Sequence, residues 1–376
     1  MELAKLAHTR EGWSQPFPAL DSPRTLVLAF AAPAADPQVL AELAAAYPTS
    51  VVIGCSTGGE IDQTRIVDES ITAAVVRFAD SRVRLAHAKL VSSSSEAAIA
   101  AGAALAEALR ADDLRAVLVL SDGISIDHSG LVRGLNTTLP DTVVVTGGFA
   151  GDGDRFARTW VLADGRPAAD TVLAVGLYGD RLRVTHGSRG GWDTFGPERV
   201  VTASKGSVVY TFDGRPALAL YKEYLGERAA ELPSSALWFP VALRETAGAA
   251  SSVVRSVLGV DEATQSLTFA GDMPVGGRAK LMRANFDRLI LGAQDAGSVA
   301  AIGDHDGPVL SIAISCIGRR LVLGERAEEE IEATLDALPP GTVQVGFYSY
   351  GEISPLASGR CELHNQTMTL TVLSEA

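Results

Sequence analysis

The sequence is poor in aromatic residues, in cysteine and in long apolar runs. Phe, Trp and Tyr make up 6% of its 376 residues, and no stretch of eighteen apolar residues is unbroken, so no membrane-spanning helix is predicted. The three cysteines, Cys55, Cys316 and Cys361, stand far apart, which excludes a disulfide framework. Together with the lack of a signal-peptide segment, this favours a reducing, cytoplasmic compartment.

Basic clusters and several catalytic motifs are absent as well. The chain has 32 Lys and Arg against 45 Asp and Glu, a net charge of −13, and no basic patch that would displace counterions from phosphates. Nucleic acid and membranes are therefore not expected partners. No HxxxH, HExxH or G-x-x-x-x-G-K-[ST] spacing occurs, which excludes a zinc hydrolase helix and a P-loop. We expect that no cofactor is required.

What the chain has in quantity is Ala, Gly and short apolar runs. It contains 37 Gly and 47% hydrophobic residues, which excludes disorder for its bulk. Strand-like runs such as 25–30 alternate with segments of helical spacing, so we predict an α/β fold with two related mixed-sheet domains built from βαβ-type units. We expect an N-terminal tail at 1–24, a first domain at 25–190 and a second at 191–376.

A weak internal repeat supports related units. Val51–Ile61 reads VVIGCSTGGEI and Val343–Ile353 reads VQVGFYSYGEI, so each short strand leads to a Gly, four further residues and Gly-Glu-Ile. Both segments follow a helical pattern that ends at proline. A looser third copy runs through a strand, a helix and Pro140 to Gly148. Strand–helix–strand units of this kind are the pattern that right-handed βαβ crossovers leave in a sequence.

The Gly-rich strand ends are the first candidate site. In α/β sheets, ligands bind beyond the carboxyl ends of parallel strands, and glycine leaves backbone N–H groups free for a carboxylate or phosphate. Hydroxyls and carboxylates in these segments would add donors and a partner for an ammonium group. The predicted ligand-binding residues are Gly54, Cys55, Ser56, Thr57, Gly58, Glu60, Gly147, Gly148, Asp152, Tyr348, Tyr350 and Glu352. Tight turns after strands fit the same glycines, and that alternative stays open.

Cysteine and histidine offer further candidates. A cysteine-dependent enzyme using Cys55 or Cys316 stays open, although the sequence identifies no base for such a nucleophile, and we predict no catalytic residue. His364 and Asn365 lie in an unusually polar run before the last strand, and we add both to the ligand site. His186 ends a strand just before a Gly-rich segment, where it could face a cleft between the two halves.

Several segments, in the same order along the chain, resemble the FIST family. They include IGCSTGGEI (Ile53–Ile61), GGFAGD (Gly147–Asp152), FDGRPALALYKEYLG (Phe212–Gly226) and LHNQTMTLTVL (Leu363–Leu373). The resemblance covers residues 25–373. It implies an N-terminal and a C-terminal FIST domain and an intracellular signal-transduction sensor rather than an enzyme.

The resemblance also implies ligands and partners. FIST proteins are thought to bind small ligands such as amino acids, and a standalone member would regulate a separate protein such as a histidine kinase or a cyclic-dinucleotide enzyme. The alternative is a haem-binding nitric-oxide sensor that regulates a histidine kinase. Haem b would then be noncovalent, because no C-x-x-C-H occurs, with His186 as the expected axial ligand. The low aromatic content counts mildly against a porphyrin pocket.

Overall fold

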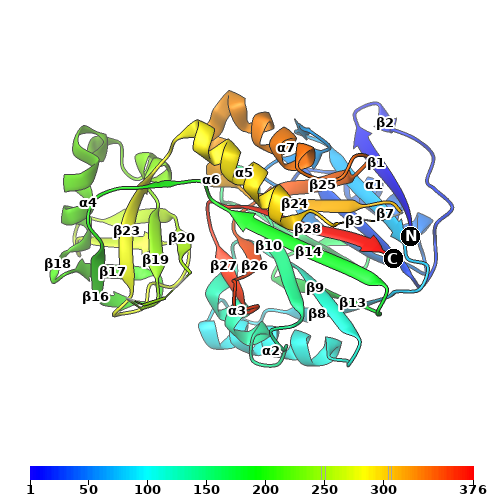
Figure 1. The fold of residues 1–376 in the computed structure, drawn as a ribbon, viewed down its shortest axis with the longest axis horizontal. Helices are drawn as coiled ribbons and strands as arrows, with labels where there is room; N and C mark the ends of the chain where they lie inside the picture. Colours follow the sequence, from blue (N-terminus) through cyan, green and yellow to red (C-terminus); the bar gives the residue numbers. More distant parts are fainter. Residues whose placement is uncertain (247, 250, 304, 306) are drawn as a thin grey trace.

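A computed structural model describes residues 1–246, 248–249, 251–303, 305 and 307–376. It shows three mixed sheets packed into one body and a β-rich insertion, residues 190–284, beside that body (Figure 1). The predicted α/β class with βαβ-type units is confirmed. Among the described residues, no helix has the length and apolar character that crossing a bilayer requires.

Each sheet is built around one repeat unit: a strand, a helical segment, a parallel strand, a hairpin and an antiparallel strand. The first unit consists of β3 (Thr25–Ala31), α1 (Pro37–Ala46), β4 (Val51–Ser56), β5 (Glu60–Asp62), β6 (Arg65–Val67) and β7 (Ile71–Arg77). The second consists of β9 (Leu114–Ser121), α3 (His128–Leu135), β10 (Val144–Phe149), β11 (Val161–Ala163), β12 (Arg166–Ala168) and β13 (Thr171–Tyr178). The third consists of β24 (Leu310–Cys316), α6 (Ile317–Leu323), α7 (Ala327–Asp336), β25 (Val343–Ser349), β26 (Glu352–Pro355), β27 (Cys361–His364) and β28 (Met368–Glu375).

The three units exchange hairpins in a closed ring. Hairpin β5–β6 of the first unit pairs with β25 of the third, β26–β27 of the third pairs with β10 of the second, and β11–β12 of the second pairs with β4 of the first. One further long strand lies on the outer side of each sheet: β1 (Glu2–Thr9), β8 (Arg82–Lys89) and β14 (Leu182–Arg189). The two-residue strand β2 (Gly12–Trp13) pairs with the end of β1. Two helices, α2 (Ser95–Leu109) and α5 (Phe286–Ala300), precede the second and third units. The looser third copy of the sequence repeat is therefore a complete structural unit.

The inner faces of the sheets share one core. Leu28, Leu120 and Ile312 lie in it, and the rings of Phe30 and Phe347 stack with centroids 4.8 Å apart. Full burial of one such side chain contributes roughly 1.5–3 kcal/mol. The helices cover the outer faces, with α1 on the first sheet, α2 and α3 on the second, and α5 and α7 on the third.

One glycine recurs at the same register in all three parallel pairs. Gly54, Gly147 and Gly346 stand opposite Ala29, Val119 and Ala313, respectively. A Cβ at these glycines would lie 1.9, 1.9 and 1.7 Å from the carbonyl oxygen of the opposite residue. Because that oxygen belongs to a paired backbone, the strands could not move aside, so glycine is required for their close approach.

The expected N-terminal tail at 1–24 is wrong for its first residues. Glu2–Thr9 form β1, which pairs along its length with β7, and Leu6 is fully buried. The alternation in this segment is weak because an edge strand leaves most of its side chains half exposed.

The insertion is an antiparallel sheet with its own core. It contains β15 (Asp193–Thr194), β16 (Arg199–Lys205), β17 (Val208–Phe212), β18 (Arg215–Pro216), α4 (Ala217–Leu225), β19 (Val241–Arg244), β20 (Val253–Arg255), β21 (Val257–Asp261), β22 (Ser266–Phe269) and β23 (Arg278–Arg283). The chain enters it after β14 and returns to the body through α5. Residues 191–376 thus hold both the insertion and the third unit, whose sheet also takes strands from residues 25–190. The division at residue 190 stays a prediction.

Candidate functional site

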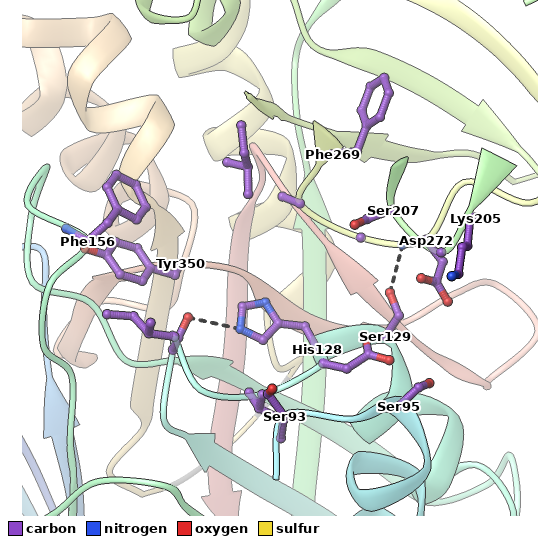
Figure 2. Close-up of a pocket in the computed structure, with 18 residues that line it drawn as sticks. Ser93, Ser95, His128, Ser129, Phe156, Lys205, Ser207, Phe269, Asp272 and Tyr350 are labelled. Atoms are coloured by element: carbon purple, nitrogen blue, oxygen red, sulfur yellow. Dashed lines mark hydrogen bonds between the residues drawn. The ribbon is translucent and has the colours of Figure 1, made fainter. Parts of the chain in front are cut away.

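A cavity of about 670 Å³ lies between the second unit and the insertion (Figure 2). The second unit contributes the loop 123–127, the start of α3 and Phe156, and the third unit contributes Tyr350. The insertion contributes the turn 205–207 and the segment 269–272. Ligands commonly bind where two structural parts meet, because both parts can supply polar groups to one concave surface.

Asp122 shapes the first of the two loops that line this cavity. Its carboxylate is buried, and Oδ1 accepts hydrogen bonds from the backbone N of Ile124 at 2.8 Å and of Ser125 at 3.2 Å. The same oxygen accepts from the Thr159 hydroxyl at 2.9 Å, while Oδ2 accepts from the backbone N of Asp170 at 3.0 Å. One carboxylate therefore fixes the loop 123–125 relative to the strands around it.

Asp152 and Tyr350 shape the second loop. Asp152 Oδ2 accepts from the backbone N of Ala157 at 3.0 Å and of Arg158 at 2.8 Å, and the Tyr350 hydroxyl donates to Oδ1. Burial acts to raise the pKa of Asp152, but these hydrogen bonds, that from Tyr350 first, outweigh it and hold the pKa below its usual value. The loop in turn places Phe156 against Tyr350, with ring centroids 4.4 Å apart and an interplanar angle of 13°.

His128 occupies the middle of the lining (Figure 2). Its Nε2 lies 3.1 Å from the carbonyl oxygen of Gly123, so Nε2 carries the proton and donates it, and Nδ1 is left as an acceptor. The ring stacks on Phe149 with centroids 3.7 Å apart. Burial lowers the pKa of His128 to about 4, so the imidazole is neutral at physiological pH.

Charged and hydroxyl groups gather on the insertion side of the cavity. Lys205 is exposed and forms no ion pair with any described residue. Asp272 pairs with Arg133 of α3, and its backbone N donates to the Ser129 hydroxyl at 3.0 Å. Further hydroxyls and a second carboxylate come from Ser93, Ser95, Ser207 and Asp127. The cavity thus combines an ammonium group, carboxylates and an aromatic wall, which suits a small molecule with charged and apolar ends.

The predicted strand-end residues are packed against one another. Cys55, Ser56 and Gly58 are buried; the backbone N of Gly58 donates to Tyr348 O at 2.7 Å, and the backbone N of Gly151 donates to Ser56 O at 2.9 Å. A Cβ on Gly148 would lie 2.8 Å from the Ile314 side chain. These segments join the units, whereas Tyr350 lines the cavity and Asp152 supports it. Whether the other strand-end residues contact a ligand stays a prediction.

Glu60 and Glu352 have matching but separate surroundings. Thr57 donates to one oxygen of Glu60, and Ser70 donates to the other through its backbone N at 3.0 Å and its hydroxyl at 2.9 Å. Ser349 and Thr367 make the same contacts with Glu352. Burial raises the pKa of Glu60 to about 7 and that of Glu352 to about 8. Tyr348 is likewise buried, and its hydroxyl donates to Glu330 at 2.9 Å.

Both candidate cysteines lie in the core. Burial, with a smaller contribution from Glu60, raises the pKa of Cys55 well above that of a free thiol. Burial also raises the pKa of Cys316, so both side chains remain protonated thiols at neutral pH.

His186 and His364 line a second cavity of about 490 Å³, together with Arg189, Trp192 and Met282. His364 Nε2 lies 3.1 Å from Ser354 O, and burial lowers the pKa of His364 to about 4. Burial and the neighbouring Arg189 also lower the pKa of His186.

Asn365, the neighbour of His364, is buried, and neither of its amide atoms has a partner among the described residues. Among all the residues that the structure describes, no group of three or more His, Cys, Asp or Glu is arranged to hold a metal ion.

Apart from Tyr350, sequence reasoning missed the residues that line the larger cavity. Asp127 and His128 fit a helix start, and Lys205 stands in no motif. Asp272 lies in Phe269–Asn285, a segment that also resembles the FIST family, but the resemblance assigns it no role. The available signal was a departure from the repeat, since the second unit places eleven residues, 150–160, between β10 and β11.

The fold and the cavity together define a three-unit α/β protein with a ligand-sized site against an inserted β domain. The model of the FIST N domain matches residues 25–215 and that of the FIST C domain matches residues 217–355, so the chain belongs to the FIST family. FIST domains are signal-transduction sensor domains implicated in small-ligand binding.

Relatives and solved structures resemble the chain at low identity. An uncharacterized protein of Mycobacterium tuberculosis is 28% identical over 344 residues, which are 89% of this chain and 86% of that protein. An uncharacterized protein of Mycobacterium bovis is 28% identical over 272 residues, covering 68% of this chain and 66% of that protein. A chorismatase structure has 8% identity and a TM-score of 0.36, over 99% of this chain and 98% of its own. A cyanuric acid hydrolase from A. caulinodans has 14% identity and a TM-score of 0.19, over 78% and 99% of the two chains.

Proposed function

We propose that this chain is a cytoplasmic sensory protein that binds a small ligand, an amino acid, in the cavity between the second unit and the insertion. Its binding would regulate a separate signalling partner such as a histidine kinase or a cyclic-dinucleotide enzyme. The observation that carries the proposal is the composition of the cavity wall, to which the body and the insertion both contribute. The excess of acidic residues again argues against a nucleic-acid partner.

The cavity matches the groups of an amino acid. Lys205 supplies an ammonium group for the ligand carboxylate, and Asp272 supplies a carboxylate for the ligand ammonium. Apolar surface at Phe156 and Leu258 is available for the side chain. A ligand that contacts the body and the insertion at once favours the arrangement in which both contacts form. The difference in affinity between arrangements sets the strength of the signal.

Titration calorimetry with the common amino acids tests the proposal. The Lys205→Ala variant is expected to lower the affinity about tenfold or more, because a charge-assisted hydrogen bond is lost. The matched control is Lys89→Ala, which removes an exposed lysine of β8 outside the cavity. Absence of binding at millimolar amino acid, or equal losses in both variants, would contradict the proposal.

The second cavity favours a second candidate, a haem-binding nitric-oxide sensor acting on a histidine kinase. The residues fit the group: His186 is a neutral imidazole that can serve as an axial ligand, Trp192 and Met282 supply apolar surface, and Arg189 is available for a propionate. Haem, when bound, would supply the iron that binds the gas. A Soret band that survives desalting and is lost in His186→Ala, but kept in His87→Ala on exposed β8, is expected under this candidate. A protein that retains no haem would rule it out.

We also propose that the chain is not a cysteine-dependent enzyme. A nucleophilic cysteine must be accessible and ionise readily, whereas the thiols of Cys55 and Cys316 are buried and protonated. Labelling of either cysteine in the folded protein by a thiol-reactive electrophile would contradict this.

A further inference from the structure

We infer that the ligand of the larger cavity carries a flat aromatic ring with a hydrogen-bond donor at its edge. This inference rests on the proposed function and narrows it to one chemical class: aromatic amino acids and related phenols and indoles. Phe156, with Tyr350 behind it, supplies the stacking surface, and His128 supplies the acceptor.

The backbone at Phe156 is the first observation. Phe156 has φ +49°, in the left-handed region that bulky side chains rarely adopt, so this conformation costs about 1–3 kcal/mol. The loop is held there by Asp152 and by the Tyr350 hydroxyl, which lies 3.2 Å from the backbone N of Phe156. What this strain achieves is the placement of a phenyl ring beside the cavity rather than in the core.

The exposure of the ring is the second observation. Phe156 is 51% exposed although one of its faces stacks on Tyr350, so its other side is open. Ile124 and Leu258, 42% and 51% exposed, line the same cavity. Three large apolar side chains from three separate segments are thus exposed at one place, which marks a surface that a ligand covers.

His128 determines which polar group the aromatic ring of the ligand must carry. Because Nε2 donates to the Gly123 carbonyl, Nδ1 can only accept, and the stacking on Phe149 fixes the plane of the imidazole. A ligand group that approaches Nδ1 must therefore donate. An indole N–H or a phenol O–H does so while remaining coplanar with the ring that stacks on Phe156.

A set of four matched amino acids tests the ring directly. L-phenylalanine is expected to bind about threefold or more tightly than β-cyclohexyl-L-alanine, which has the same apolar bulk without a π face. L-tyrosine or L-tryptophan is expected to bind about threefold or more tightly than L-phenylalanine, because each adds a donor for His128.

The variant Phe156→Leu is expected to abolish the preference for phenylalanine over its cyclohexyl analogue, while Tyr210→Leu keeps it. Tyr210 is a 38% exposed aromatic residue of β17 outside the cavity, and an unchanged thermal midpoint in both variants would show that each is folded. Equal binding of phenylalanine and the cyclohexyl analogue, or a preference that survives Phe156→Leu, overturns the inference but leaves amino-acid binding intact.

Indole and p-cresol, which lack the amino and carboxyl groups, test recognition of the aromatic ring separately from binding of an amino acid. Binding of these compounds without binding of any amino acid would support the aromatic site and overturn the amino-acid proposal. If neither the amino acids nor the free rings bind, both fail.

Discussion

The second unit of the body differs from the first and third in which residue supplies a buried carboxyl group to the segment before its antiparallel strand. In the first and third units, Glu60 and Glu352 accept hydrogen bonds from the residue just before the antiparallel strand, Ser70 or Thr367. In the second unit the residue at that place is Asp170, and its backbone N donates to Asp122 instead. Asp122 directly follows β9 and does not belong to the hairpin β11–β12. No residue of that hairpin therefore has to supply the carboxyl group in the second unit.

In the second unit the loop that leads to the hairpin is longer than in the first unit, where only residues 57–59 connect β4 to β5. Residues 150–160 lead from β10 to β11, and in this loop Asp152 holds the backbone while Phe156 lines the cavity. The repeated residues hold the units together, whereas the loop in which the second unit departs from the repeat contributes to the site. A search for function from the repeated motif alone therefore finds the framework first.

The largest expected effect on stability comes from replacing the glycine that all three units have at the same position of their parallel strand pair. Alanine at Gly54, Gly147 or Gly346 would place a Cβ within 2 Å of a backbone oxygen, so each variant should lose about 3 kcal/mol or more of unfolding free energy. Urea denaturation measures this. Gly303→Ala is the control, because no atom of the other described residues lies within 4 Å of its added Cβ. If Gly147→Ala were tolerated while the other two were not, the second unit would differ in its sheet as well as in its loop.

A second effect, of intermediate size, tests the carboxyl of the first and third units. The folded protein holds Glu352 protonated up to about pH 8, whereas the unfolded chain ionises it near pH 4.5. The folded state therefore binds the extra proton between these values, and stability falls as pH rises through them, at about 1.4 kcal/mol per pH unit. Glu352→Gln cannot ionise and should flatten this loss between pH 5 and pH 8, while exposed Glu42→Gln should not. Identical pH slopes for wild type and Glu352→Gln would refute it.

The smallest effect on stability is expected at the loop that only the second unit has. Tyr350→Phe removes the hydroxyl that binds Asp152, and the unfolding free energy should fall by only about 1 kcal/mol, since Asp152 keeps two backbone donors. Hydrogen exchange at Ala157 and Arg158 should nevertheless accelerate, and ligand affinity should drop. Tyr210→Phe is the control. Unchanged exchange in the loop would show that Tyr350 does not hold it.

Much of the framework could be predicted because periodicity and turn residues carry it. The strand at Thr25 and the helix at Pro37 follow from local patterns, and the recurrence of Gly-Glu-Ile reveals the units. The exchange of hairpins could not be predicted. Which strand β5 pairs with depends on contacts with β25, nearly three hundred residues away, and no local pattern encodes such a partner.

The cavity was beyond sequence reasoning for a related reason. Lys205 and Asp272 come close to His128 only because the insertion docks on α3, and that docking rests on tertiary contacts such as Arg133 with Asp272. Asp152 and Tyr350 were found among the glycines, but their structural role is to position Phe156. A motif shows which residues occur together in sequence and leaves open whether they contact a ligand or each other.

The ring of exchanged hairpins has a consequence for synthesis. As the chain emerges from the ribosome, β5 and β6 are complete long before their partner β25 exists, so the first unit must wait with an unpaired hairpin until the third has been made. Unpaired strands can associate with other chains, and Arg65 and Asp62, charged residues on this hairpin, oppose such association. The pairing of β25 with β5 therefore joins one of the last strands to be synthesised to one of the first, a contact of high sequence separation.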